Sequence, residues 1–412
     1  MAERVVVTGM NAITPLGHSL KETWGNLIKG VSGVGPITQF DSSNYLAKIA
    51  CEVKNFNPEE FMSPREARRR DRFEQFAAVA VQGALQQSGL DSANSNPERI
   101  GVIFSTAIGG ITTLAETFAL VDSNQSRRVS PFAIPMLMLN GSAGMVSIDY
   151  SFQGPSFAVV SACASGADSI GIAWMLIRAG VIDAAITGAS EATVTPTGIA
   201  AFDRIGALSR RNQDFSMTPQ PFDKNRDGLV MGEGAAALVI EAESHARARG
   251  AEILAELSGY AATADAFHIT APSDDGSGGA RAIRQALQSA GVNPGEVGYI
   301  NAHGTATELN DLSETKAIKA ALGDLAYNIP VSSTKSMTGH MMGATGALEA
   351  AICVQVVREG VLPPTIHYET PDPLCDLDYV PNQARQAQVS VAFSNAFGFG
   401  GHNAVLVVKK YR

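Results

Sequence analysis

Charged residues are scarce in this chain: only 17% of its 412 residues are Asp, Glu, Lys or Arg, and the formal net charge is -9. A protein that follows nucleic-acid phosphates usually needs a broad basic surface, so this balance excludes general nucleic-acid binding. Cysteine is scarce as well, with four scattered residues and no Cys-x-x-Cys pair. That pattern excludes a disulfide framework and a structural zinc site, and it favours a reducing cytoplasm.

The sequence also lacks an uninterrupted apolar segment that could cross a membrane. The longest uncharged run, 129–148, is broken by Pro131 and Pro135, so we expect it to be buried or to face another subunit. The first residues lead straight into a Val-Val-Val run, without the basic and hydrophobic segments of a signal peptide. We therefore expect a cytoplasmic protein that makes no use of a membrane.

A nucleotide-binding loop is missing too. No Gly-x-x-x-x-Gly-Lys-Ser/Thr sequence occurs, and the Gly-x-Gly stretch at 232–234 is followed by a strand-like segment instead of a helix. Nucleotide phosphates therefore have no evident cradle.

Aliphatic residues, by contrast, are frequent throughout: 45% of the chain is apolar, enough for a large core and for two fused halves. Short aliphatic runs alternate with helical stretches, which predicts an α/β fold with parallel strands. A helix over 167–178 is apolar almost all round and should be buried. The halves echo each other weakly, with a boundary near Gly250, giving 1–250 and 251–412. The expected strands are 4–8, 100–105, 156–161, 184–187, 235–241, 297–302, 329–333, 389–394 and 404–408.

Cys163 is the strongest candidate nucleophile. It follows an apolar strand and precedes the buried helix, so its sulfur should lie at a helix N-terminus, where free amides and the helix dipole lower a thiol pKa. A small core cysteine is the alternative reading, and it suits Cys353, inside a helical run, better. Cys51 and Cys375 have acidic neighbours, which oppose a thiolate.

Three further segments, 301–307, 334–340 and 397–403, follow strands and carry polar residues between glycines. Ligands in open α/β sheets bind beyond the carboxyl ends of strands, so His303 and His340 could converge with Cys163 on one site. One histidine alone is more often a structural residue. A metal site is disfavoured, because neither histidine belongs to a His-Glu-x-x-His helix.

Five arginines lie between positions 65 and 72, and Arg127 and Arg128 form a second basic cluster. One interpretation is a solvated helix face. The other is a docking patch for a small acidic partner, whose association the charges would accelerate.

With these motifs in place, the sequence resembles the β-ketoacyl-acyl carrier protein synthases of fatty-acid synthesis, specifically the synthase II type, over essentially its whole length. The resemblance is carried, in order, by 4–9, Ala-Cys-Ala-Ser-Gly at 162–166, Asn-Ala-His-Gly-Thr at 301–305, Lys-Ser-Met-Thr-Gly-His at 335–340, and 398–403. It implies a thiolase-like fold whose pseudo-duplicated halves form a layered α-β-α-β-α sandwich. The N-terminal half would carry the nucleophile and the C-terminal half both histidines.

The resemblance also implies a reaction. Cys163 would accept an acyl chain and condense it with malonyl-acyl carrier protein in a decarboxylative Claisen reaction, giving 3-oxoacyl-carrier protein, carbon dioxide and free carrier. His303 and His340 would stabilise the enolate, and the amides of Cys163 and Phe399 would form the oxyanion hole. No cofactor is implied beyond the phosphopantetheine arm of the carrier protein, and no metal belongs to the catalytic set. A homodimer is expected.

Further roles follow from the same resemblance. Lys335 and Glu349 would orient the histidines, and Thr270, Thr305 and Thr307 would hold the pantetheine arm. The acyl pocket would be lined by Ile108, Phe202 and Phe399, with Phe399 as its gate. The carrier protein would dock on Arg65, Arg68, Arg69, Arg127 and Arg128. The alternatives are a surface ion pair, turn-forming threonines and core apolar residues. A monovalent cation near Asn301, Glu349, Ser394 and Asn395 stays an open possibility.

Two positions depart from the family pattern. Gly206 occupies a position that is basic in the family, and 308–310 replaces a Pro-containing run. Two other functions stay open: the ketosynthase subunit of a type II polyketide synthase, which would need a cysteine-less partner, and a non-catalytic scaffold that binds acyl chains. The scaffold would need neither the cysteine nor the histidines.

Overall fold

The computed structural model describes residues 3–412, so Met1 and Ala2, the first residues of the expected N-terminal half, lie outside the described residues. Ten strands form one continuous sheet in the order β10-β9-β13-β14-β8-β1-β7-β6-β4-β5. Its first half contains β1 (Val5–Ile13), β4 (Ile100–Ser105), β5 (Ser156–Phe157), β6 (Ala184–Glu191) and β7 (Gly234–Ala242). The second contains β8 (Ala255–Ala264), β9 (Tyr299–Asn301), β10 (Val331–Ser332), β13 (Val391–Gly398) and β14 (His402–Lys409).

The two halves meet where β1 pairs with β8, through Val5–Leu257, Val6–Glu256 and Val7–Ala255. Parallel pairing occurs on one side of each half: β4 runs parallel to β5 and β6, and β9 runs parallel to β10 and β13. The remaining pairs of this sheet are antiparallel. The predicted parallel strands are therefore only half of the sheet, because β13 returns directly as β14 and β7 lies between two antiparallel neighbours.

Two buried helices lie between the halves of the sheet. α7 (Ser165–Arg178) and α13 (Thr345–Glu359) pack on each other and on strands of both halves. In α13 every residue from Thr345 to Val357 is buried. Most of these residues are apolar or small, as a helix buried all round requires, and the charged exception, Glu349, is paired with Lys335. The predicted buried helix over 167–178 corresponds to α7.

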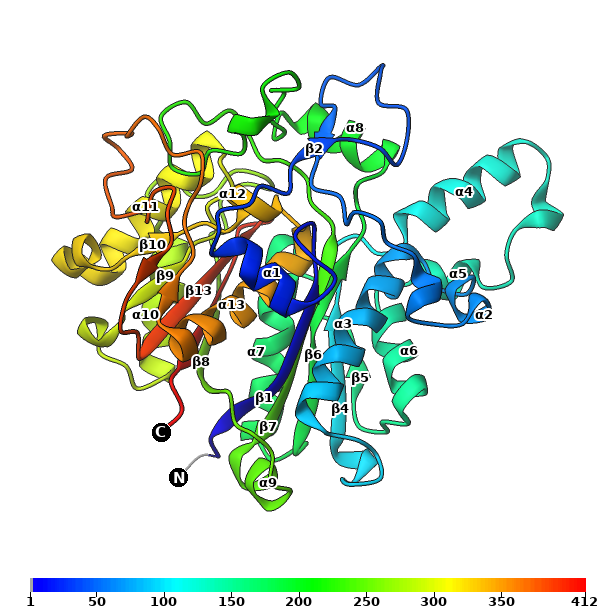
Figure 1. The fold of residues 1–412 in the computed structure, drawn as a ribbon, viewed down its shortest axis with the longest axis horizontal. Coiled ribbons are helices and arrows are strands. Elements are labelled where there is room, and N and C mark those ends of the chain that lie inside the picture. Colours follow the sequence, from blue (N-terminus) through cyan, green and yellow to red (C-terminus); the bar gives the residue numbers. More distant parts are fainter. Residues whose placement is uncertain (1–2) are drawn as a thin grey trace.

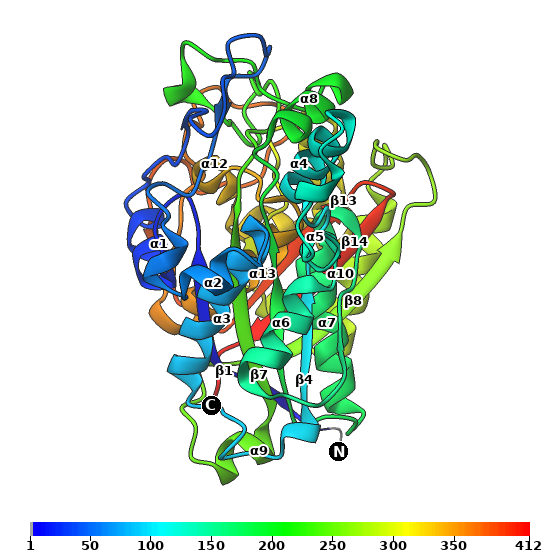
Figure 2. The ribbon, with the colours of Figure 1, turned by 90° about the vertical axis from the view of Figure 1, so that its right-hand side faces the viewer.

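Further helices cover the outer faces (Figures 1 and 2). α3 (Arg72–Ser88) and α6 (Gly141–Tyr150) pack on the first half, and α10 (Ser277–Ser289) packs on the second half and carries α11 (Glu308–Leu322). The result is the α-β-α-β-α sandwich that the resemblance implies. The remaining elements are α1 (Leu20–Leu27), α2 (Pro64–Ala67), α4 (Ile111–Asp122), α5 (Ala133–Leu137), α8 (Pro196–Ile205), α9 (Glu243–Ala248), α12 (Lys335–Thr338), and the short strands β2 (Gly35–Pro36), β3 (Ile49–Ala50), β11 (Val361–Leu362) and β12 (Arg385–Gln386).

The uncharged run 129–148 forms α5 and most of α6, joined by a short turn. Its apolar side chains are largely exposed, with Ile134 at 65% and Ile148 at 75%. The run is therefore not a buried segment, so the expectation of burial is wrong, whereas the exposure is compatible with a subunit-facing position. Among the helices of residues 3–412, none combines the length and the apolar character that a membrane span requires.

Candidate active site

A single cavity of about 330 Å³ brings together the sulfur and both imidazoles singled out from the sequence. Cys163 reaches it from the turn before α7, His303 from the loop after β9, and His340 from the loop after α12. These segments lie far apart in the chain but end on the same side of the sheet, as parallel strands with polar C-terminal loops do. The same cavity is lined by Phe202, Thr270, Thr305, Thr307, Phe397 and Phe399.

Cys163 lies in a 3-10 turn, Ala162–Ala164, directly before the first residue of α7. Its expected strand, 156–161, is much shorter in the structure, because the chain leaves β5 after Phe157. Burial raises the pKa of the Cys163 thiol to about 11, although the Lys335 charge and the amides of Phe399 and Cys163 itself oppose the shift. The lowered pKa expected from the helix N-terminus is wrong for this structure, because the loss of water around the sulfur outweighs the Lys335 charge and the two amides.

Alkylation of Cys163 by iodoacetamide should accelerate about tenfold per pH unit between about pH 7 and about pH 10, because only the thiolate reacts. With a pKa of about 11 the thiol stays mostly protonated throughout this range. The measurement is the initial labelling rate at each pH, read by intact mass. Cys163→Ser gives the background from the other buried cysteines. A rate that levels off below about pH 8 would instead support the lowered pKa expected from the helix N-terminus.

His303 and His340 lie edge to face, with ring centroids 5.3 Å apart and planes at 85°. Both side chains are buried, and burial together with the Lys335 charge holds the pKa of each well below its usual range. Both rings are therefore neutral at pH 7. His340 Nδ1 lies 3.1 Å from the Thr345 hydroxyl. If that hydroxyl donates, the proton of His340 lies on Nε2 and can be donated to a ligand.

A buried ion pair lies behind the histidines. Lys335 Nζ donates to Glu349 Oε1 at 2.5 Å, and both side chains are almost completely buried. It is thus not the surface ion pair considered above. Its position lets Lys335 act on the cysteine and on both imidazoles through charge.

Two residues of this site were missed in the sequence. Glu314 of α11 accepts hydrogen bonds from the amides of His303 and Gly304, at 2.8 and 2.7 Å, and from the Asn395 side chain at 3.0 Å. Thr345 contacts His340. A glutamate near the start of a helix and a threonine at its first position are both common in sequences, so neither residue type indicates a site. The only sequence signal for these two residues was their spacing from the histidines.

The four residues named in the sequence analysis as possible neighbours of a monovalent cation also lie in this part of the protein. Asn301, Glu349, Ser394 and Asn395 each keep one buried side-chain oxygen without a hydrogen-bond partner among residues 3–412. Asn301 and Ser394 are register partners in β9 and β13, and Asn395 and Glu349 both lie close to Glu314. Oxygen-only sites of this kind suit hard cations, so the residues fit such an ion.

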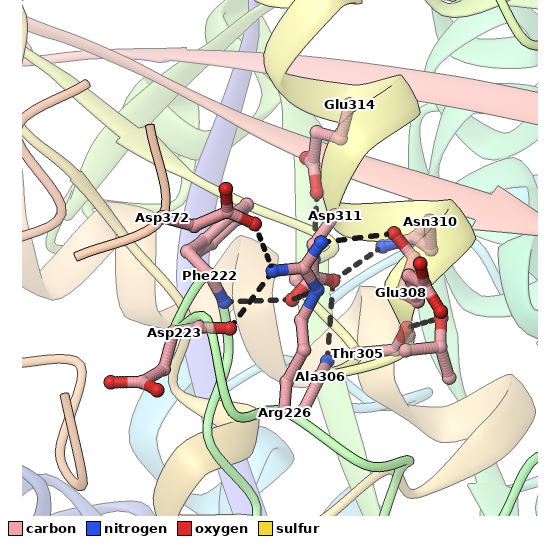
Figure 3. A network of polar contacts seen from close by, with 12 residues as sticks. Phe222, Asp223, Arg226, Thr305, Ala306, Glu308, Asn310, Asp311, Glu314 and Asp372 are labelled. Carbon is pink, nitrogen blue, oxygen red and sulfur yellow. Dashed lines mark hydrogen bonds and ion pairs between the residues drawn. The ribbon is translucent and has the colours of Figure 1, made fainter. Parts of the chain in front are cut away.

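The threonine loop at the cavity mouth is held by a buried network (Figure 3). The hydroxyls of Thr305 and Thr307 lie 2.9 Å apart, and Ala306 between them has a left-handed backbone, with φ +66°. Asp311 accepts the Ala306 amide at 3.2 Å, while Arg226 donates to the Glu308 carbonyl at 3.2 Å. The loop is therefore fixed from behind by charged groups, which keeps both hydroxyls on the cavity.

Phe399 and Phe202 stack at the cavity with ring centroids 6.2 Å apart. Gly400 and Gly401, which follow Phe399, have φ of +84° and +72°, a conformation that favours glycine. Ile108, expected in the same pocket, does not line this cavity within the described chain. Its amide donates to Glu191, and the adjoining glycines 109 and 110 pack against the segment 136–139 of the exposed run.

The arginine cluster of 65–72 divides in two. Arg70 pairs with Asp149 and Arg72 with Glu233, so both are structural. The five arginines expected to dock a partner are solvent-accessible, and the guanidinium of Arg69 lies 4.5 Å over the ring of Phe132, next to the second cluster. α2 and α5 lie together in Figure 1. The contact between Arg69 and Phe132, four residues after Arg128, is what links the two basic clusters in the structure.

Both departures from the family pattern lie at the end of a helix. Gly206 ends α8 in a left-handed conformation with φ +79°, which a basic residue would adopt at a cost. The segment 308–310 forms the first turn of α11 after Thr307.

The chain matches two family models: "Beta-ketoacyl synthase, N-terminal domain" over residues 2–246 and "Beta-ketoacyl synthase, C-terminal domain" over 254–369. It is 49% identical to a 3-oxoacyl-[acyl-carrier-protein] synthase 2 of Synechocystis sp., covering 100% of this chain and 99% of the relative, and 49% identical to one of Staphylococcus aureus, covering 99% of each. Among solved structures, the ketosynthase of a type II PKS in complex with its acyl-carrier protein has a TM-score of 0.93 at 34% identity, with full coverage of both chains. A β-ketoacyl synthase from Burkholderia phymatum has a TM-score of 0.92 at 33% identity, again with full coverage of both chains.

Proposed function

Because this chain belongs to the β-ketoacyl synthase family, we propose that it is a 3-oxoacyl-acyl carrier protein synthase of fatty-acid biosynthesis, of the synthase II type. The observation that carries the proposal is the one cavity in which a thiol meets two neutral imidazoles. The 49% identity over the full chain to synthases of that name supports the pathway. The enzyme is a cytoplasmic acyltransferase that works on substrates carried by acyl carrier protein, and its four cysteines, all free, suit a reducing compartment.

In the first half-reaction the Cys163 sulfur attacks the carbonyl of an acyl thioester. The developing oxyanion accepts hydrogen bonds from the amides of Cys163 and Phe399, both of which reach the sulfur. The bond to the carrier sulfur then breaks, and the thiol proton leaves with that sulfur as the free carrier thiol. The chain is left on Cys163, which divides the reaction into two easier steps. Phe399 must move with the acyl chain, and the glycines after it give the backbone that freedom.

In the second half-reaction a malonyl thioester takes the place of the carrier. His303 and His340 donate hydrogen bonds to its thioester carbonyl, so that the electrons of the breaking carbon–carbon bond collect on that oxygen as carbon dioxide leaves. The enolate carbon attacks the acyl carbonyl, and the carbon–sulfur bond to Cys163 breaks. The product is a 3-oxoacyl thioester two carbons longer, and the cysteine thiolate takes up one proton. Burial, aided by the Lys335 charge, keeps both rings neutral and able to donate.

The phosphopantetheine arm would reach Cys163 past the hydroxyls of Thr270, Thr305 and Thr307, which line the same cavity. A cation held by Asn301, Glu349, Ser394 and Asn395 would offset the buried carboxylates of Glu349 and Glu314. Such a cation would help to hold these side chains in place and would take no part in the reaction itself.

The direct test combines the purified chain with an acyl-carrier protein and malonyl-carrier protein. One 3-oxoacyl-carrier protein should form for each carbon dioxide released, from this one polypeptide alone. The structural likeness to the ketosynthase of a type II PKS, at 34% identity, favours the second candidate, a polyketide ketosynthase subunit. That function would be indicated if elongation required a second chain.

Reversing two docking charges, in Arg65→Glu with Arg127→Glu, should raise the KM for acyl-carrier protein by about tenfold, because like charges would then meet an acidic partner. The KM for an acyl-pantetheine substrate should stay within about twofold, since the cavity is untouched. Lys410→Glu, an exposed cation at the other end of the chain, is the matched control. Equal losses with both substrates would contradict a docking role, and so would an effect that added salt leaves unchanged.

We also propose that the enzyme is a homodimer through the face made by α4, α5, α6 and β5, which is turned toward the viewer in Figure 2. β5 is the edge of the sheet, and large apolar side chains around it are exposed. They are Phe118, Val121, Ile134, Met138, Leu139, Ile148 and Val160. Such patches, rimmed by an unpaired strand, mark protein interfaces.

The variant Ile134→Asp with Ile148→Asp should therefore elute as a monomer in size-exclusion chromatography with light scattering, because two charges would be buried in the interface. Leu374→Asp, at an exposed apolar residue outside this face, should leave the mass unchanged. A monomeric mass for the unmodified chain would contradict the proposal.

A further inference from the structure

The turn that carries Cys163 contains a strained residue. Ala162 has φ +52°, in the left-handed region, although it is not glycine. Non-glycine residues adopt this conformation only at an energetic cost, so surrounding contacts must hold them there. Cys163 follows directly, and any relaxation of Ala162 would turn its sulfur and amide away from Phe399.

Hydroxyl groups hold this turn from one side. The Ser161 amide donates to Ser165 Oγ at 3.0 Å, and the Ser165 hydroxyl donates to the Ala162 carbonyl at 2.7 Å. The Ser161 hydroxyl donates to Asp168 Oδ2. On the other side the turn packs against Gly398. A Cβ added at Gly398 would lie 2.8 Å from the Ser161 carbonyl oxygen and 3.0 Å from the Cys163 backbone nitrogen. The turn therefore has little room to shift, and its anchor is Asp168.

Asp168 is buried in the first turn of α7 and makes a second contact that crosses the molecule. Its Oδ1 accepts from the Tyr260 hydroxyl at 2.6 Å. Tyr260 belongs to β8, in the other half of the sheet, and its ring lies against Gly171, where an added Cβ would be 2.3 Å from the ring. The position of the nucleophile turn is thus tied to the second half of the protein through one carboxylate.

The surroundings of Asp168 favour a role in positioning the turn over contact with a substrate or pairing with a lysine or arginine. Asp168 does not line the cavity in the described chain, so it does not reach a substrate. Within residues 3–412 it forms no ion pair with lysine or arginine. Burial raises the pKa of Asp168 while the two hydroxyl donors oppose that shift, and the N-terminus of α7 also favours the charged form. A buried carboxylate whose only donors lead to the nucleophile turn and to β8 has no evident use other than to join them.

We propose that Asp168 and Tyr260 are positioning residues: through the Ser161 hydroxyl they hold the left-handed turn that presents the Cys163 sulfur beside the Phe399 amide. The inference rests on the proposed role of Cys163 as the nucleophile and adds the groups that place it. It makes the acylation half-reaction depend on a contact between the two halves, whereas decarboxylation of the malonyl thioester by the histidines does not depend on this contact.

The test compares Asp168→Ala, Asp168→Asn and Tyr260→Phe with the unmodified chain. The rate of Cys163 alkylation at one fixed pH and kcat for acyl transfer to Cys163 should fall by about 10- to 100-fold in Asp168→Ala, with KM within about twofold. Asp168→Asn, which still accepts from Tyr260, and Tyr260→Phe, which removes one donor, should each lose less. Malonyl decarboxylation should stay within about twofold in all three variants.

Two controls separate this role from general damage. Ser161→Ala should lower alkylation, and adding Asp168→Ala to it should lower it little further, because both act through one contact. Glu241→Gln removes a buried carboxylate that accepts from Thr8 at the far end of β7, so it should reduce thermal stability without slowing alkylation.

The inference is overturned if alkylation is unchanged in Asp168→Asn and Tyr260→Phe, or if acylation and decarboxylation fall equally. Should Asp168→Ala fail to fold, those two milder variants decide the matter. Alkylation needs no substrate, so slower alkylation in a chain that never elongates an acyl group would keep this inference and reject the proposed function.

Discussion

Cys163→Ala should lower the rate of condensation by about 10,000-fold or more, because removing the nucleophile of a covalent mechanism removes both half-reactions. The intact mass of the unmodified chain should increase by one acyl group on incubation with an acyl thioester, and that increase should be absent in the variant. The cavity itself should persist, since Ala replaces a small buried side chain.

Cys353→Ala is the matched control. Cys353 is also fully buried, in α13, but it does not line the cavity within the described chain. Its loss should cost about 1 kcal/mol of stability, as small core truncations do, and leave acylation intact. Acylation that persists in Cys163→Ala, or that disappears in Cys353→Ala, would contradict the assignment of the nucleophile.

His303→Ala and His340→Ala should each lower condensation by about 100- to 1000-fold, the usual effect of losing one donor to a developing oxyanion. Acyl transfer to Cys163 should stay within a few fold, because the oxyanion of that step faces the amides of Cys163 and Phe399. The separation is measured by following acyl-enzyme formation by intact mass and carbon dioxide release in parallel.

Further variants sharpen the histidine test. His340→Asn keeps a side-chain N–H donor and should retain more activity than His340→Ala. The double variant should lose far less than the product of the two single losses, because both rings serve one oxygen. His367→Ala replaces a histidine whose ring lies against the Pro219 carbonyl, outside the cavity, and should leave both steps unchanged. Equal loss of acylation and condensation in His303→Ala would contradict the division of labour.

A resting site of neutral groups has a chemical advantage. The thiol and both imidazoles are uncharged because burial of these side chains disfavours their charged forms. Neutral imidazoles with a buried lysine behind them remain hydrogen-bond donors without becoming acids, so the enolate is stabilised without being protonated early.

The motifs around the chemistry could be recognised in the sequence because each is short and local. Cys163, His303 and His340 each follow a strand and lie beside glycine or alanine, and strand ends on one side of a sheet must meet. The largely buried α7 was predicted correctly for a similar reason, since a helix that is apolar almost all round has few other places to go. The same reasoning overextended the strand before Cys163, because no residue pattern marks where β5 leaves its neighbour.

Properties that depend on contacts between residues far apart in the chain could not be predicted from such local motifs. The direction of the Cys163 pKa shift was wrong, because the cost of burying a thiolate depends on everything that excludes water around it. Arg70 and Arg72 resemble their neighbours in sequence, yet Asp149 and Glu233 bind them. Glu314 was overlooked for the same reason, since its partners are backbone amides that only the fold brings near.

By itself the sequence therefore determined the candidate site residues, the α/β layers and the family. These depend on local order along the chain: a strand, a small-residue turn and a side chain that can react. Only the tertiary structure decided the charge state of those residues, the separation of structural from accessible arginines, and the Asp168–Tyr260 contact that ties the nucleophile turn to the second half. Each of these is set by groups tens to hundreds of residues apart, because desolvation and hydrogen bonding act through space and leave no pattern at short sequence range.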